Sequence, residues 1–216
     1  MITLILARHG QSHGNLDHSL GQDTGLTDLG REQASRLGRW LVERGYKFTA
    51  LYCSPLRRAC QTAEIVNAHF GLEIAFEPDL RESEGDHLSG RPRRANPLDA
   101  DHPPPFGPEY EGLRERVARA TGRILAENPE GQVLVVAHAG TLGTMLRCIL
   151  STHALLVHTE FGAVHALRWE DGRWILHYLN RTPSWPAEGF TLSTNPQKRS
   201  RGDLSGGSPA FERRRL

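Results

Sequence analysis

The sequence predicts an α/β protein: a three-layer sandwich with a mainly parallel central sheet, an antiparallel hairpin at one edge and helices on both faces. Three short apolar runs, at 2–7, 50–54 and 133–139, are typical of strands that are covered on both sides. Helical patterns separate these runs, and this alternation favours parallel strands joined by right-handed crossovers. Towards the end, Asp171-Gly172 between two β-rich stretches predicts a hairpin.

Four segments have the apolar spacing of helices that pack on a core. The first begins after Thr27, a residue favoured as N-cap, and ends at Gly45, a residue favoured just beyond a helix. The second follows Pro55, which suits the start of a helix. The predicted helices cover 27–45, 56–71, 112–128 and 141–151.

A length of 216 residues predicts one globular domain, which we place at 1–181. Inside it, residues 91–110 contain six prolines and no periodicity, which predicts a long irregular loop. Such loops are either lids or disordered segments, and we favour a lid over the site. Residues 182–216 lose apolar periodicity and gain Gly, Ser, Pro and basic residues, so we expect a disordered tail.

The composition of the chain indicates which binding partners and which cellular compartment to expect. Lys and Arg number 26 against 25 Asp and Glu, so the net charge of the chain is close to zero and gives no reason to expect nucleic-acid binding. Three cysteines without metal-ligand or disulfide-framework spacing are typical of a reducing cytosol. We find no signal-peptide pattern and no run near the about 20 apolar residues of a membrane helix. We therefore expect a cytoplasmic protein with no membrane partner, whose oligomeric state the sequence does not predict.

Polar residues follow each of the three predicted parallel strands. Arg8-His9-Gly10 follows the first, the stretch 54–58 the second, and His138-Ala139-Gly140 the third. Since ligands bind at the carboxyl edge of such sheets, two histidines and two arginines would form a cationic pocket there, suited to a phosphoryl group. Neighbouring arginines lower the pKa of a histidine, and a neutral imidazole can attack phosphorus. We expect Gly10 to let the backbone turn close to the anion.

Five stretches resemble, in order and spacing, the histidine phosphatase superfamily, also called the phosphoglycerate mutase-like family. They are RHGQSHGN (8–15), GLTDLGREQA (25–34), SPLRRACQTA (54–63), LRE (80–82) and VVAHAGTLGTML (135–146). The resemblance extends over residues 2–180, and five motifs in register are far more specific than RHG alone.

This resemblance implies hydrolysis of a small phosphomonoester through a phosphohistidine on His9, with no metal and no other cofactor. Glu82 corresponds to the family's proton donor, which later activates the attacking water. The resemblance implies catalytic roles for His9, Glu82, His138, Arg8 and Arg58. It implies phosphate binding by Arg8, Asn15, Arg58 and His138.

The chain departs from the family pattern after Glu82. Where members often have a stretch like FGxWEG, this chain has SEGDHLSG (83–90), so Glu84 is an alternative donor. Cofactor-dependent mutases have a longer insertion here with an ERHYG-like stretch, whereas this chain has the short loop at 91–110. We therefore predict a phosphatase of this family, with mutase-type phosphoryl transfer as the alternative.

Two other classes of function remain open from the residues alone. His9 and His13 are four residues apart, the spacing of a metal-binding pair on one helix face, but Gly10 and Gly14 disfavour a helix there. The same fold can also serve as a non-catalytic module that binds a phosphorylated ligand, because fold does not fix function.

Overall fold

The computed structural model describes residues 1–16, 23–83, 108–152 and 156–183. Within these ranges, six strands form one sheet in the order β3-β2-β4-β1-β5-β6. The strands are β1 (Ile2–Arg8), β2 (Ala50–Cys53), β3 (Ile74–Phe76), β4 (Gly131–Ala137), β5 (Val164–Glu170) and β6 (Arg173–Arg181). The helices are α1 (His13–Leu16), α2 (Asp28–Glu43), α3 (Arg57–Asn67), the short 3₁₀ turn η1 (Pro78–Leu80), α4 (Pro108–Glu127) and α5 (Ala139–Ile149).

The pairing of the strands confirms the predicted mainly parallel sheet with an antiparallel edge. Strands β3, β2, β4 and β1 are parallel neighbours, whereas β5 runs antiparallel to β1 and β6 antiparallel to β5. Arg8 is opposite Ala137 and Cys53 is opposite Val136, so β1, β4 and β2 end side by side. This alignment brings the residues after three strands to one edge.

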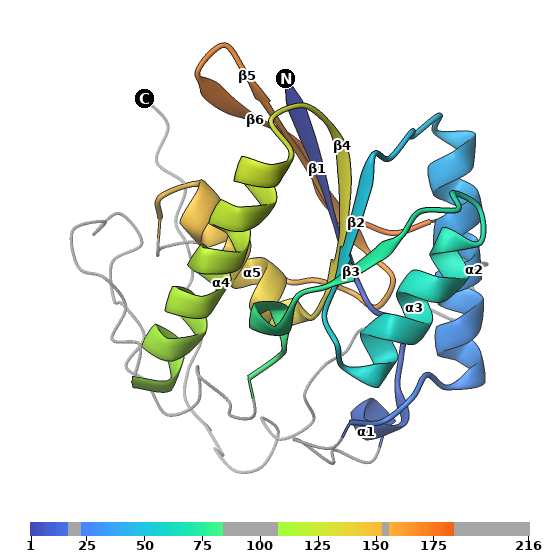
Figure 1. Cartoon of the computed structure of the whole chain (residues 1–216). Coiled ribbons are helices and arrows are strands. Elements are labelled where there is room, and N and C mark those ends of the chain that lie inside the picture. Colours follow the sequence, from blue (N-terminus) through green and yellow to red (C-terminus); the bar gives the residue numbers. More distant parts are fainter. Residues whose placement is uncertain (17–22, 84–107, 153–155, 184–216) are drawn as a thin grey trace, which may run out of the picture.

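Helices cover both faces of the sheet, as predicted (Figure 1). Side chains alternate along β1: Leu4 and Leu6 face the core shared with α4 and α5, whereas Ile5 and Ala7 face the core shared with α2 and α3. Because both faces of the central strands are buried, their sequences are continuous apolar runs rather than alternating ones.

The predicted ends of α2 are confirmed. Thr27 is the N-cap, and its hydroxyl accepts a hydrogen bond from the Gly30 N–H at 3.0 Å. After the last turn, Gly45 adopts the left-handed region at φ +73°, a conformation that costs glycine little.

Three parts of the fold differ from the predictions. Strand β3 and the short α1 were not predicted, because three and four residues are too few for a periodic pattern. Helix α4 begins at Pro108, inside the segment 91–110 that we predicted as irregular, since proline is tolerated in a first turn.

The remaining predictions on organisation are not tested by this structure. Residues 91–107 of the expected lid and 184–216 of the expected tail lie outside the described residues, and the domain limits stay a prediction. Across the described ranges, each helix is too short or too polar to cross a membrane.

Candidate active site

His9 lies directly beyond the end of β1 and is almost completely buried, at 2% exposure. Its backbone N–H donates to the Ala137 carbonyl at 3.0 Å, which extends the β1–β4 ladder by one residue. The ring atom Nδ1 lies 2.6 Å from the Gly10 carbonyl oxygen. A carbonyl can only accept, so Nδ1 carries the proton and Nε2 keeps its lone pair.

Arg58, in the first turn of α3, donates from Nε to His9 Nε2 at 3.3 Å. Burial lowers the pKa of His9 well below its ordinary value, and the positive charges of Arg8 and Arg58 lower it further. The imidazole is therefore neutral at neutral pH, and the lone pair of Nε2, which here accepts the Arg58 N–H, is the one that would attack an electrophile.

Arg8 is held by the segment that precedes β5. Its guanidinium donates from Nη1 to the Thr159 carbonyl at 2.5 Å and lies over the Phe161 ring, 3.8 Å from the ring centroid. Burial lowers the pKa of Arg8 to about 10, while the carboxylates of Glu82 and Glu160 act in the opposite direction. Arg8 therefore remains a cation at neutral pH in a water-poor setting.

His138 is the N-cap residue of α5 and is fully buried, with its ring centroid 5.0 Å from that of His9. Its Nε2 lies 2.8 Å from the Ser54 hydroxyl, which also accepts the Leu56 N–H at 3.3 Å. A serine hydroxyl can donate to Nε2 or accept from it, so this contact fits either neutral tautomer of His138. Burial, followed by the charges around it, lowers the pKa of His138 well below its ordinary value.

Two buried nitrogen atoms of this group lack a hydrogen-bond partner among the described residues: Arg8 Nε, which carries a hydrogen, and His138 Nδ1. A buried N–H without a partner costs about 1–3 kcal/mol, and the oxygens of an anionic ligand would remove that cost. Together with Arg58, these groups form a site in which the arginines supply the positive charge and both histidines are neutral. Such a site is suited to a phosphoryl group.

Glu82 reaches the same edge from another direction, after η1. Its Oε2 accepts the Gly140 N–H at 3.0 Å, and its Oε1 accepts from the Thr141 hydroxyl at 3.3 Å, so the carboxylate lies on the N-terminus of α5. A Cβ atom on Gly140 would lie 2.7 Å from Oε1, so any other residue at 140 would displace the carboxylate from this position. The carboxylate raises the pKa of Arg8 and Arg58 against the effect of burial, which places it within electrostatic reach of both.

Asn15 is the predicted site residue whose side chain is hydrogen-bonded to Ser12. It lies in α1, and its side-chain oxygen accepts from the N–H of Ser12 at 3.0 Å and from the Ser12 hydroxyl at 2.7 Å. Within the described part of the chain, its hydrogen bonds therefore go to Ser12 rather than to His9 or the arginines.

The structure gives another physical reason for glycine at position 10 than the expected turn close to an anion. Gly10 is not among the glycines with positive φ, and a Cβ there would lie 2.3 Å from the Gly30 carbonyl oxygen. In turn, a Cβ on Gly30 would lie 1.9 Å from the Gln11 carbonyl oxygen. The chain after His9 therefore packs backbone to backbone against the first turn of α2.

Sequence reasoning missed several residues that hold the site. Ser54 lies within the motif 54–63 and contacts His138, so the motif contained a signal for it. Thr159 and Phe161 hold Arg8 but follow no motif, because only the pairing of β5 with β1 brings them there. The alternative donor Glu84 lies outside the described residues.

The geometry also bears on the metal hypothesis. His9 precedes α1 and His13 begins it, so the two histidines do not share a helix face. The part of the chain that the structure describes contains no group of three or more His, Cys, Asp or Glu side chains that could hold a metal ion.

Known proteins resemble this chain in sequence and in fold. Residues 4–182 match the model of the histidine phosphatase superfamily (branch 1). The 2,3-bisphosphoglycerate-dependent phosphoglycerate mutase of Methylorubrum extorquens (strain PA1) is 35% identical over 165 residues, 66% of this chain and 76% of that protein. The alpha-ribazole phosphatase of Shigella flexneri is 26% identical, with a TM-score of 0.66 over 83% of this chain and 96% of that one.

A phosphoserine phosphatase of Entamoeba histolytica, solved in complex with 3-phosphoglyceric acid, has a TM-score of 0.67 at 21% identity. The match covers 84% of this chain and 98% of that one and shows a common fold. Both phosphatases and a mutase are therefore similar to this chain.

Proposed function

The chain belongs to the histidine phosphatase superfamily, branch 1, and on this premise we propose that it hydrolyses small-molecule phosphomonoesters through a phosphohistidine on His9. The observation that carries the proposal is the state of His9: buried, neutral, with the lone pair on Nε2 and a cation beside it. Such an imidazole is a nucleophile that needs no base.

In the first step, the lone pair of His9 Nε2 forms a bond to phosphorus, and the bond from phosphorus to the ester oxygen breaks. The electron pair of that bond goes to the leaving oxygen, which takes a proton from Glu82. Arg8, Arg58 and His138 bind the phosphoryl oxygens and stabilise the charge that develops on them. The unpartnered buried nitrogen atoms of Arg8 and His138 support this role, in which His138 carries its proton on Nδ1.

In the second step, water attacks phosphorus, the bond from phosphorus to Nε2 breaks, and its electron pair returns to the ring. The proton of the water goes to Glu82, which is restored for the next cycle. Asn15 is proposed as a further phosphate-binding residue through its amide N–H groups, because its oxygen is already engaged by Ser12. No metal or other cofactor takes part in this scheme.

Phosphoryl transfer of the mutase type is the second candidate. The 35% identity to the mutase of Methylorubrum extorquens favours it. The similarity to an alpha-ribazole phosphatase over most of both chains supports hydrolysis. So does the absence of an ERHYG-like stretch between Glu82 and α4 in the sequence. We therefore favour hydrolysis.

The test is a panel of phosphomonoesters (sugar phosphates, phosphoglycerates, nucleotides and phosphoserine) assayed for phosphate release with wild type, His9→Ala and His13→Ala. We expect wild type and the His13 variant, whose histidine is exposed, to release phosphate from at least one substrate. The His9 variant should be inactive, and acid-labile radiolabel from a labelled substrate should be trapped only on proteins that retain His9.

The alternatives give different results. Interconversion of phosphoglycerates without phosphate release would overturn hydrolysis in favour of mutase-type transfer. Loss of turnover in excess chelator, or equal loss in both histidine variants, would favour a metal site instead. Binding of substrates without any label or turnover would indicate a non-catalytic module.

A further inference from the structure

Glu82 has no regular secondary structure to position it. It follows η1 and lies outside the helices and strands of the described chain, whereas His9 directly continues a strand. The direction in which its side chain leaves the backbone therefore depends on contacts made by the segment 77–81 with the helices beside it.

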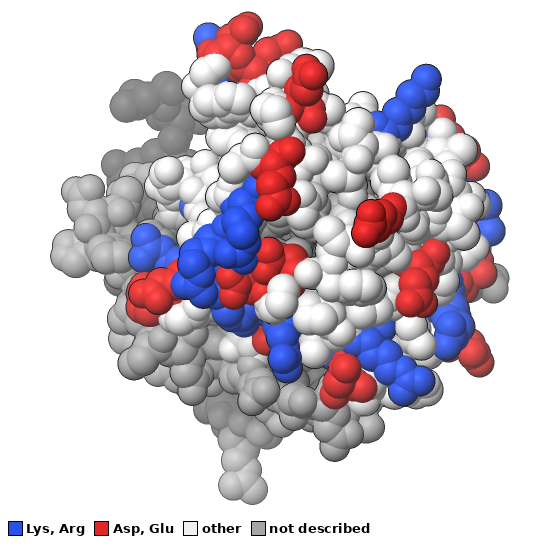
Figure 2. Space-filling view, viewed as in Figure 1, with Lys and Arg blue, Asp and Glu red and all other residues white. Residues whose placement is uncertain are grey.

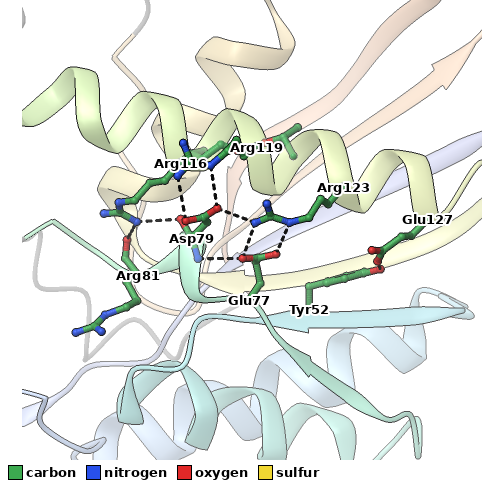
Figure 3. A network of polar contacts seen from close by, with 10 residues as sticks. Tyr52, Glu77, Asp79, Arg81, Arg116, Arg119, Arg123 and Glu127 are labelled. Atoms are coloured by element: carbon green, nitrogen blue, oxygen red, sulfur yellow. Dashed lines mark hydrogen bonds and ion pairs between the residues drawn. The ribbon is translucent and has the colours of Figure 1, made fainter.

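Helix α4 presents three arginines to this segment: Arg116, Arg119 and Arg123, at spacings of three and four that place them on one helix face. Arginine and acidic side chains gather side by side over α4 on the face seen in Figure 2. Figure 3 shows the contacts: Arg123 Nη2 lies 2.8 Å from Glu77 Oε1 and 2.7 Å from Asp79 Oδ2, and Arg119 Nε lies 3.5 Å from Asp79 Oδ2.

Arg116 differs from the other two in what it binds. Its Nη1 donates to the backbone carbonyls of Asp79, at 2.9 Å, and of Arg81, the residue before Glu82. Arg116 is half-buried, whereas Arg119 and Arg123 are exposed. The ion pairs of Arg119 and Arg123 hold the carboxylates of Glu77 and Asp79. Of the three arginines, Arg116 is the one that holds the carbonyl directly before Glu82, so its contacts bear most directly on where that side chain starts.

The carbonyl of Arg81 is held from two helices at once. The Thr141 hydroxyl of α5 lies 3.1 Å from it and also 3.3 Å from Glu82 Oε1, while Arg116 reaches it from α4. On the other side of the segment, Leu80 is fully buried in the core with Leu113 and Val117 of α4. The peptide just before Glu82 is thus tied to both helices.

We propose that Arg116 is a positioning residue for the proton donor: by holding the carbonyls of Asp79 and Arg81, it sets the position from which Glu82 delivers its proton to the leaving oxygen. The inference rests on the proposed function, because it takes Glu82 as the donor. It assigns Arg116 no contact with the substrate.

The experiment compares two substrates that differ in their need for a proton. p-Nitrophenyl phosphate has a leaving group that is stable as an anion, whereas the alkoxide from glycerol 2-phosphate must be protonated. In Arg116→Met, we expect kcat/KM for glycerol 2-phosphate to fall about tenfold more than for p-nitrophenyl phosphate, and in Glu82→Gln about a hundredfold more. Arg119→Met, the matched control three residues along the same face, should leave the ratio unchanged.

Arg116→Lys retains a cationic group with N–H donors on a differently shaped and shorter-reaching head, so it should recover part of the ratio. It also replaces Arg116→Met if that variant fails to fold. An unchanged ratio in folded Arg116 variants, or an equal fall for both substrates, would overturn the inference while leaving hydrolysis standing. Failure of wild type to hydrolyse either substrate would instead count against the proposed function, and the inference would fall with it.

Discussion

The two sides of the site are held in different ways. The nucleophile side, consisting of His9, Arg8, Arg58 and His138, follows the ends of parallel strands and the first turn of a helix. Its position is set by backbone pairing, including the His9 N–H to the Ala137 carbonyl. The donor side, consisting of Glu82 and the segment 77–81, begins with a backbone bond from the Glu77 N–H to the Cys53 carbonyl. Its carbonyls nearer to Glu82 are held by side chains from α4 and α5.

This difference teaches which parts of the site are rigid and which can be adjusted. Displacing His9 requires the shift of a strand buried on both faces, which disturbs two hydrophobic cores. Displacing Glu82 requires the loss of a few hydrogen bonds to α4 and α5. Changes on the nucleophile side should therefore affect every substrate equally, and changes on the donor side should depend on the leaving group.

The largest effect that tests this comparison is expected for Arg58→Met. The variant removes a cation and a donor that act on the phosphoryl group, so kcat/KM should fall about 10²–10³-fold for p-nitrophenyl phosphate and glycerol 2-phosphate alike. The exposed neighbour supplies the control, since Arg57→Met should have little effect. A loss confined to one substrate would show that the two sides are not separable.

The same variant has a pH signature. Arg58 is one of the charges that lower the pKa of His9, so its removal raises that pKa towards the ordinary value. His9 would then become protonated, and unable to attack, at a higher pH than in wild type. The acid limb of the kcat/KM profile should shift to higher pH in Arg58→Met and stay in place in Arg57→Met.

The second prediction compares the stability effects of two glycine-to-alanine variants, one where the glycine packs against another backbone segment and one on an open helix surface. Glycine to alanine in a helix ordinarily stabilises by about 0.5–1 kcal/mol, and Gly122→Ala in α4 should do so because nothing lies within 4 Å of its added Cβ. Gly30→Ala should instead destabilise by about 3 kcal/mol, because its Cβ would meet the Gln11 carbonyl beside His9. Urea denaturation measures both, and the same sign for the two variants would contradict the backbone contact.

The smallest predicted effect is a loss of folding stability at acidic pH through His165. His165 is buried, with Nε2 3.0 Å from the Thr159 hydroxyl and Nδ1 accepting the Asn180 N–H at 3.1 Å, and burial lowers its pKa to about 4. Below its unfolded pKa of about 6.5, the unfolded chain binds a proton that the folded chain does not, so stability is lost as pH falls from there towards 4.

Acidification from pH 7 to pH 5 should lower the free energy of unfolding by about 2 kcal/mol through this group. Urea denaturation of wild type and His165→Gln at both pH values checks the prediction. The variant should lose less stability on acidification, by about that amount; equal losses would mean that His165 does not supply it.

The comparison of the two sides also explains how much the sequence predicted. The sheet, its edge hairpin and the α2 cap follow from local patterns, and the alignment of three strand ends was expected from parallel pairing. His9, Arg58 and His138 were therefore expected together, and the structure brings them together. Their catalytic roles, like those of Arg8 and Glu82, stay predictions, and so does phosphate binding by Asn15.

The donor side was less predictable because its contacts join parts of the chain that no local pattern relates. Arg116 binds backbone carbonyls of the segment before Glu82, which is distant in sequence. Its position in the helical pattern does not distinguish it from Arg119, whose partner is a carboxylate. The support of Arg8 by Thr159 and Phe161 was missed for the same reason. A motif identifies the reacting groups, whereas the residues that hold them depend on tertiary packing.

The contact between Arg116 and the carbonyl before Glu82 has a consequence for how such a protein can diverge. Among the described residues, the contacts of the α4 arginine face are with the donor side, and on the nucleophile side the charge of Arg116 acts on His138. Substitutions along this face can therefore accumulate while His9 and its neighbours are inherited unchanged. Descendants of one ancestor could in this way come to favour different leaving groups without any change in the motifs by which the family is identified.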